Sequence, residues 1–423
     1  MPGLEARRAA VQLLHAVTVL GRPLDRALDG ALHKLKERGD RALARALASL
    51  SLRHLPGLDA LIDGATVQSL PPDARARQAL RIALAGRLLL DTPPHAAIAT
   101  ILPLLEGGPR RLVHGVLSTL FRTGAQLPPA SLPEPWAQRW RSQWGDAMVE
   151  AAAAQFAAMP PADLRLADPA KTAEWAARLG ATSLMPAHLR LAGSQTVEAL
   201  AGFAEGAWWV QDVAAQLPVT LMGDVSGKRV LDLCAAPGGK TMQLAAAGAH
   251  VTALDISAPR MAILAGNLAR TGLPAEQIVA DARSWEPEAL FDAILLDAPC
   301  SATGTFRRHP DTLHLKAALD LGPLQGMQRA LLARAAAWLK PGGLLVSAVC
   351  SLERGEGEDA REALLAGTGL VADPVEPEEL PEGLAPDADG AVRTLPGLWS
   401  DAGGADGFYI FRATKAQSAT RPG

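Results

Sequence analysis

The stretch VLDLCAAPGGKT (residues 230–241) decides the fold of the last part of this chain. An apolar run ends in Asp232, a loop of small residues follows, and helical sequence begins at Thr241. Small residues let the chain turn tightly at the carboxyl edge of a parallel strand, where open α/β sheets bind their ligands. The loop matches neither GxGxxG nor GxxxxGKS or GxxxxGKT, which excludes a dinucleotide fingerprint and a P-loop.

Strand-like and helical segments alternate around this stretch. RVLDLC, HVTALDI, QIVAD, FDAILLDAP and GLLVSAVCS are separated by helical patterns, which predicts a doubly wound, Rossmann-like α/β sheet. Upstream, residues 4–122 carry apolar residues at helical spacing and predict an all-α domain. LPPASLPEP (127–135) has four prolines and is typical of a linker. We therefore expect a helical domain (1–126), this linker, a small mixed α+β region (136–217) and an α/β domain (218–423).

Composition narrows the class of protein. The chain is 49% hydrophobic and 20% charged, which is typical of a soluble globular protein. The first residues read as a helix rather than a signal peptide, and no apolar run approaches the ~18 residues of a membrane span. Three scattered cysteines, without CxxC or HExxH, predict neither disulfides nor a metal site. We expect a cytoplasmic, monomeric protein that binds no membrane and no metal.

Charge is distributed unevenly along the chain. Residues 1–130 carry 17 Lys and Arg against 10 Asp and Glu, whereas residues 351–423 carry 6 against 14. A basic first third suggests an anionic partner such as nucleic acid. An ordinary solvated surface would give the same count.

Acidic residues end three successive strand-like runs. After Asp232, ALDIS places Asp255 at the end of the second run, and IVAD places Asp281 at the end of the third. A carboxylate there can accept both hydroxyls of a ribose, or an adenine amino group. A single strand-terminal Asp is as often a helix cap. Three beside one glycine-rich loop favour a nucleoside cofactor.

Two cysteines, each followed by serine, end two further runs. Cys300 lies in LLDAPCSATG and Cys350 in LLVSAVCSLE. Adjacent parallel strands lie about 4.8 Å apart, so both thiols can face one pocket. A cysteine that ends an apolar strand is usually part of the core. A pair beside a nucleoside loop favours chemistry, although spacing does not assign roles to the two thiols.

Four motifs resemble a known family. DLCAAPGGKT, ALDIS, DAPCSATGTFRRHPD and CSLERGEGE are similar to S-adenosylmethionine-dependent RNA cytosine-5 methyltransferases, especially the branch that acts on bacterial 16S rRNA. LDRAL, DRALARAL, LRIAL and FRTG resemble its NusB-like RNA-binding domain, and GAWWVQDVAAQL and DGFYIF also match. The resemblance implies a class I methyltransferase domain over 218–423, with a mostly parallel seven-stranded sheet, and 16S rRNA as the substrate.

The resemblance also implies the site residues. The expected S-adenosylmethionine pocket consists of Cys234, Ala235, Ala236, Pro237, Gly238, Gly239, Lys240, Asp255, Asp281 and Asp297. Cys350 is expected to attack the base and Cys300 to assist release, whereas in DNA cytosine-5 enzymes the Pro-Cys cysteine attacks. Asp297 could also steady the protonated cytosine ring. Cys234 is expected to shape the loop only.

Arg307, Arg308 and His309 follow Cys300 closely and are expected to bind RNA phosphates. A surface cluster with Asp311 is the alternative. We expect the nine tryptophans to pack in cores rather than stack on bases.

Three positions depart from the family pattern. Val349 replaces the usual Thr before the nucleophile, and Ala167 and Gly115 replace usual Asn residues. Two other functions therefore remain open at this point: a tRNA cytosine-5 methyltransferase, and a catalytically silent NusB-like RNA-binding or ribosome-assembly factor.

Overall fold

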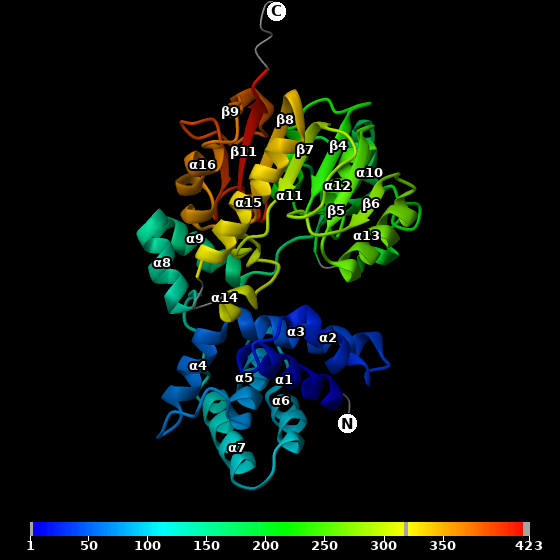
Figure 1. Ribbon diagram of the computed structural model, residues 1–423. Coiled ribbons are helices and arrows are strands. Elements are labelled where there is room, and N and C mark those ends of the chain that lie inside the picture. Colours follow the sequence, from blue (N-terminus) through cyan, green and yellow to red (C-terminus); the bar gives the residue numbers. More distant parts are fainter. Residues whose placement is uncertain (1–2, 194, 317–319, 418–423) are drawn as a thin grey trace, which may run out of the picture. The chain divides into compact units, whose positions relative to one another are not determined.

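The structure is a computed structural model that describes residues 3–193, 195–316 and 320–417 (Figure 1). Residues 1–2 and 418–423, at the ends of the expected first and last domains, lie outside the described residues. The chain divides into two compact units. We call Met1–Met159 with Phe306–Ala318 the helical unit, and Pro160–Thr305 with Leu319–Gly423 the sheet unit.

The helices predicted over residues 4–122 are present in the helical unit. Their apolar faces meet in one core, in which Leu13, Leu47, Leu84 and Leu117 are fully buried. The elements of this unit are α1 (Leu4–Thr18), α2 (Leu24–Leu32), α3 (Arg38–Arg53), α4 (Leu55–Gly64), α5 (Arg75–Leu89), α6 (Pro94–Ile101), the 3-10 helix η1 (Leu102–Leu104), α7 (Gly107–Arg122), α8 (Glu134–Trp144), α9 (Asp146–Ala157) and α14 (Thr312–Leu315).

The helical unit extends beyond the boundary expected at residue 126. Helices α8 and α9, expected in the mixed region, belong to it. The reason is aromatic packing with a distant segment: the rings of Trp140 and Phe156 lie 5.5 and 6.1 Å from that of Phe306, between centroids. All three side chains are fully buried, so this contact removes a large apolar area from water.

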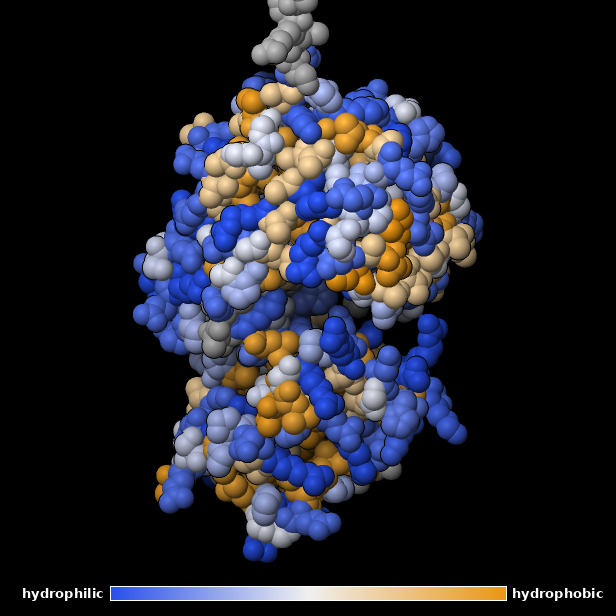
Figure 2. Space-filling view, in the orientation of Figure 1, coloured by the Kyte–Doolittle hydropathy of each residue, from blue (hydrophilic) through white to orange (hydrophobic). Residues whose placement is uncertain are grey.

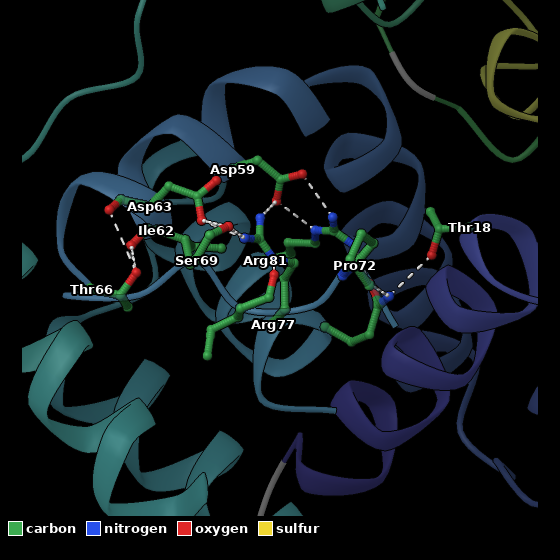
Figure 3. Close-up of polar contacts among 11 residues, drawn as sticks. Thr18, Asp59, Ile62, Asp63, Thr66, Ser69, Pro72, Arg77 and Arg81 are labelled. Carbon is green, nitrogen blue, oxygen red and sulfur yellow. Dashed lines mark hydrogen bonds and ion pairs between the residues drawn. The ribbon is translucent and has the colours of Figure 1, made fainter. Parts of the chain in front are cut away.

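Buried ion pairs hold α4 against α5 (Figure 3). Arg81 contacts both carboxylate oxygens of Asp59 at 2.8 and 2.7 Å, and Arg77 lies 3.0 Å from Asp59 and also pairs with Asp63. Both arginine side chains are only 4% exposed. Part of the positive charge counted in the first third of the sequence therefore lies inside the unit. The buried arginines among residues 3–130 are Arg7, Arg53, Arg77 and Arg81.

On the face seen in Figure 2, polar residues in blue and apolar residues in orange are interspersed. No helix in the described part of the chain is long and apolar enough to cross a membrane.

The sheet unit begins with a small antiparallel sheet of order β2-β1-β3. Its strands are β1 (Asp163–Leu166), β2 (His188–Arg190) and β3 (Trp208–Val210), with η2 (Pro169–Lys171), α10 (Thr172–Leu179) and η3 (Val197–Ala199) between them. The third strand lies in GAWWVQDVAAQL, and all three lie within the region expected to be mixed α+β (136–217).

The main sheet is doubly wound and mostly parallel, as predicted. Among the described residues it has eight strands, ordered β10-β11-β8-β7-β4-β5-β6, with β9 paired to β11. Both β9 and β10 pair along the edge of β11 opposite β8, at different levels, so no level of the sheet is more than seven strands wide. The strands are β4 (Arg229–Leu233), β5 (His250–Asp255), β6 (Glu276–Val279), β7 (Phe291–Asp297), β8 (Leu339–Val349), β9 (Leu370–Ala372), β10 (Val392–Thr394) and β11 (Phe408–Lys415).

Helices cover both faces of this sheet. Leu295 packs with α11 and α12 on one face, and its neighbour Leu296 packs with α15 and α16 on the other, as strand alternation requires. The boundary expected after residue 217 falls inside α11, which belongs to this core. The helices are α11 (Val213–Thr220), α12 (Gly239–Ala246), α13 (Ala258–Thr271), α15 (Gly322–Trp338), α16 (Glu358–Leu365), and η4 (Thr303–Thr305), η5 (Arg354–Glu356), η6 (Pro377–Glu379) and η7 (Ser400–Ala402).

Candidate active site

The loop between β4 and α12 turns through two left-handed residues. Cys234 has φ of 67° and Gly238 has φ of 105°. A Cβ at Gly238 would lie 2.8 Å from Leu264 Cγ, so this position requires glycine. The strand, the small-residue turn and the helix are thus arranged as VLDLCAAPGGKT predicted.

Backbone hydrogen bonds tie this loop to the end of β5. The N–H groups of Cys234 and Ala235 donate to the Leu254 carbonyl at 2.9 and 3.1 Å. Asp255, which is 3% exposed, accepts from Ala236 N at 3.1 Å and from Ser257 N at 2.8 Å. The loop and Asp255, the acid predicted to bind a ribose, are therefore held rigidly together at this edge of the sheet.

Asp281 lies just after β6, the next strand of the sheet. Its carboxylate pairs with the Arg283 side chain at 2.6 Å, and these hydrogen bonds lower the pKa of Asp281 to about 2. An amino group bound at this carboxylate would share it with Arg283.

Lys240 and Asp297 form an ion pair at the same edge of the sheet. Lys240 Nζ donates to Asp297 Oδ2 at 2.7 Å, and the Lys240 side chain is 10% exposed. Burial acts against the ammonium, but Asp297 and then Cys350 outweigh it and raise the pKa of Lys240. A fixed cation thus lies close to one of the two candidate thiols.

Asp232 is fully buried below the loop. It accepts a 2.5 Å hydrogen bond from Thr241 Oγ1 in the first turn of α12. Burial raises the pKa of Asp232 to about 7, with Asp297 and Asp255 adding to the effect. This hydrogen bond ties the end of β4 to the first turn of α12, on either side of the loop.

The two predicted thiols meet. Strands β7 and β8 are adjacent and parallel, with Asp297 opposite Ala348, and the turns that follow them bring Cys300 Sγ to 3.4 Å from Cys350 Sγ. The hydrogen bond to Cys350, burial, and the nearby Glu356 carboxylate raise the pKa of the Cys300 thiol. Burial likewise raises the pKa of Cys234.

The segment after Cys300 corrects one expectation. Arg307 is 1% exposed, and its carbonyl accepts a 2.5 Å hydrogen bond from Arg53 inside the helical unit. Its guanidinium is therefore not on the surface expected to bind RNA. His309 is 51% exposed, 3.6 Å from Asp25, and Arg308 is half-buried. Asp311 accepts from Leu24 N at 2.9 Å and so caps α2.

The tryptophans pack as expected. In the described part of the chain, most of the tryptophan side chains are buried: Trp136, Trp140, Trp175, Trp208, Trp209 and Trp338. They contribute to cores rather than to an exposed stacking surface.

Comparisons with known proteins show the family of the chain. Residues 219–413 match a family model described as 16S rRNA methyltransferase RsmB/F, and residues 4–120 match the NusB family. A ribosomal RNA small subunit methyltransferase B from Xylella fastidiosa is 36% identical over 98% of this chain and 98% of its own. The chain belongs to the RsmB/F methyltransferase family. A namesake from Pseudomonas putida, also 36% identical, covers 97% of this chain and 99% of its own.

Two solved structures have a fold similar to that of the RsmB/F chain. The crystal structure of PH0851 has a TM-score of 0.75 at 23% identity and covers 98% of this chain and 99% of its own. A methyltransferase homologue from Pyrococcus horikoshii has a TM-score of 0.55 at 26% identity and covers 70% and 98%. As a member of the RsmB/F family, the protein is an RNA methyltransferase that uses S-adenosylmethionine.

The residues present fit that cofactor. The carboxylate of Asp255 suits the ribose hydroxyls, and Asp281 suits the adenine amino group. Lys240 and Asp297 offer opposite charges, as the carboxylate and ammonium ends of the methionine moiety require. The Asp232 Oδ1 atom at this edge is buried without a hydrogen-bond partner among the described residues.

Sequence reasoning missed the residues that join the two RsmB/F cysteine turns. Glu356 accepts from Ser301 N at 2.9 Å and from Ser351 Oγ at 2.6 Å. The signal was present: a serine follows each cysteine, and Glu356 lies within CSLERGEGE. The pattern did not reveal that one carboxylate serves both turns.

Proposed function

We propose that this RsmB/F protein transfers the methyl group of S-adenosylmethionine to carbon 5 of a cytosine in 16S rRNA, through a covalent adduct with Cys350. The 3.4 Å approach of Cys300 and Cys350, beside the Lys240–Asp297 pair, is the observation that carries this proposal. Two thiols at one edge are more than a core requires, and they are what this reaction uses.

Cytosine carbon 5 is a weak nucleophile and does not attack a sulfonium methyl group unaided. Addition of the Cys350 thiolate to carbon 6 forms an S–C bond, opens the C5=C6 double bond and makes carbon 5 nucleophilic. When bound, S-adenosylmethionine supplies the methyl group as an electrophile. A base then removes the proton from carbon 5, and the S–C6 bond breaks to release the thiolate.

The neighbouring groups have roles in this scheme. Asp297 holds the protonated ring nitrogen of the cytosine as charge develops, and Lys240 keeps that carboxylate in place at 2.7 Å. Cys300 assists release of the product. Val349 is 5% exposed in an apolar cluster, so its side chain contributes shape without a hydrogen bond.

The helical unit supports an RNA substrate through its match to the NusB family. Arg308 and His309 remain candidates for phosphate contact, and binding should weaken as salt rises. We place the reaction in the cytoplasm, with the protein acting as a monomer.

Methylation of a 16S rRNA fragment with labelled S-adenosylmethionine tests the proposal. Cys350→Ala should abolish incorporation, whereas Cys300→Ala should accumulate a covalent protein–RNA complex on a denaturing gel. Bisulfite sequencing of the product locates the modified carbon. Incorporation into tRNA alone would reassign the substrate, and absence of S-adenosylmethionine binding by calorimetry would indicate a silent RNA-binding factor.

A further inference from the structure

Glu356 lies under both cysteine turns at the end of η5. Its side chain is 2% exposed. On one side it accepts from the backbone N–H of Ser301, with its two oxygens at 2.9 and 3.2 Å. On the other side it accepts from the hydroxyl of Ser351 at 2.6 Å. One carboxylate therefore contacts the residue that follows each of the two cysteines.

Further contacts close this network. The hydroxyls of Ser301 and Ser351 lie 2.9 Å apart. Gln328 of α15 donates to Glu356 at 3.1 Å and to the Pro299 carbonyl at 3.0 Å, one residue before Cys300. The spacing of the thiols is thus set by hydrogen bonds to neighbouring residues, and Glu356 is the group on which those bonds converge.

The partners of Glu356 are all neutral. They are an amide N–H, a hydroxyl and a carboxamide, and among the described residues no Lys or Arg forms an ion pair with it. Its oxygens accept all of these hydrogen bonds. A buried carboxylate acts strongly on titratable groups nearby, because the surrounding protein screens charge less than water does.

The two thiols therefore have different surroundings. The largest influences on the Cys300 thiol are its hydrogen bond with Cys350, burial, the Cys350 charge and Glu356, opposed by the Ala302 N–H, and together they raise its pKa. Cys350, in contrast, acts on the Lys240 ammonium. Glu356 is thus one of the groups that oppose ionisation of the Cys300 thiol.

We propose that Glu356 is a positioning residue that fixes the separation of the two thiols and keeps Cys300 in its protonated form, so that the thiolate forms at Cys350. On ionisation the Cys350 proton passes to solvent and the Cys300 proton stays on its sulfur, from which it can donate a hydrogen bond to the Cys350 thiolate. The catalytic use of the two thiols rests on the proposed function. The difference in their ionisation does not.

Alkylation by iodoacetamide as a function of pH tests this, with modification of each cysteine measured by mass spectrometry on the full-length protein. The reagent forms a thioether with a thiolate and releases iodide. In the native protein, modification of Cys300 should lag behind that of Cys350 throughout the titration. In Glu356→Gln, the Cys300 profile should move to lower pH, with a rate rise of about tenfold for each unit of pKa lost.

Two variants serve as controls. Glu362→Gln makes the same carboxylate-to-amide change at an exposed position of α16 and should leave both profiles unchanged. Glu356→Asp keeps the charge but shortens the side chain, so it should keep the native Cys300 profile while kcat for methylation falls and KM for RNA stays near its native value.

Equal alkylation rates for Cys300 and Cys350 in the native protein would overturn the inference, and this result does not depend on whether Glu356→Gln folds. An unchanged Cys300 profile in folded Glu356→Gln would overturn it as well. Neither measurement requires RNA or cofactor, so failure of methylation would refute the proposed function and leave the thiol result standing.

Discussion

Asp63 in the helical unit and Asp232 in the sheet unit both accept a hydrogen bond from a hydroxyl, yet their pKa values move in opposite directions. Asp63 accepts from Ser69 Oγ at 3.0 Å, and Asp232 accepts from Thr241 at 2.5 Å. Burial alone would raise both values. The guanidinium of Arg77 outweighs burial at Asp63 and lowers its pKa, whereas burial dominates at Asp232 and raises its pKa to about 7.

The two carboxyls differ in whether nearby cations outweigh the effect of burial on the pKa. A carboxylate with a lowered pKa contributes stability that is lost as the pH falls through its folded-state pKa. A carboxylate with a raised pKa contributes stability that is lost as the pH rises from its ordinary value of 3.8 through its folded-state value of about 7. With rising pH, Asp63 therefore adds to the free energy of unfolding, whereas Asp232 subtracts from it.

Arg77→Met should have the largest effect, because it leaves Asp63 without its cation and Asp59 with only Arg81. Breaking a buried ion pair costs several kcal/mol, and we expect a loss of about 3 kcal/mol here because both carboxylates are partly exposed. Urea unfolding followed by circular dichroism measures it. Arg75→Met, at an exposed position of the same helix, should cost less than about 0.5 kcal/mol. Equal costs would show that the pairs add nothing.

Asp232→Asn should remove the uncompensated carboxyl without changing its shape. In the native protein, Asp232 contributes a fall in unfolding free energy of up to ~1.4 kcal/mol per pH unit as the pH rises. In the variant this contribution should vanish. Urea unfolding at several pH values between 3.8 and about 7 measures the slope. A slope that is the same in both proteins would contradict the raised pKa.

Lys240→Met should remove a cation that lies near Asp297 and Asp232 in the sheet unit. We expect this change to weaken cofactor binding. We expect the Kd for S-adenosylmethionine to rise about tenfold, equivalent to about 1.4 kcal/mol. Calorimetry provides the measurement. Lys340→Met breaks a similar Lys–Asp pair, to Asp292 at 2.6 Å, at a more exposed position and should leave the Kd near its native value. A like effect of both variants would argue against a cofactor role for Lys240.

Ser69→Ala should have the smallest effect. Its hydrogen bond to Asp63 is exposed, so we expect a loss of about 0.5 kcal/mol and a slightly higher pKa for Asp63. The matching change Thr241→Ala removes a fully buried bond to Asp232 and should cost more, about 1 to 2 kcal/mol. Unfolding of the two variants under the same conditions compares them. A larger loss at Ser69 would reverse the comparison.

The sheet and its edge could be predicted from sequence because their signals are local. Strand and helix periodicities alternate over short stretches, and VLDLCAAPGGKT brings the turn and its anchoring Asp232 into twelve consecutive residues. The meeting of Cys300 and Cys350 followed from one rule, that adjacent parallel strands end at the same edge. Residues close in sequence or related by a topological rule are thus accessible to prediction.

What sequence reasoning missed depends on contacts between distant residues. Arg307 reads as a surface cation, but Arg53, 254 positions earlier, binds its carbonyl within the core. Glu356 reads as one acid in an acidic tail, yet it joins turns that lie 50 residues apart in the chain. Residue type alone does not indicate which charged side chains become buried on folding. The count of Lys and Arg in the first third of the sequence therefore overestimates the positive charge at the surface.

The segment Phe306–Ala318 has a practical consequence for dissection of the protein. No single cut yields an intact helical unit, because a fragment ending at Met159 lacks the Leu313 carbonyl that binds Trp136 Nε1 at 2.7 Å and the Asp311 cap of α2. Such a fragment should aggregate through its uncovered aromatic surface. Exchange of helical units between relatives must therefore graft both stretches together.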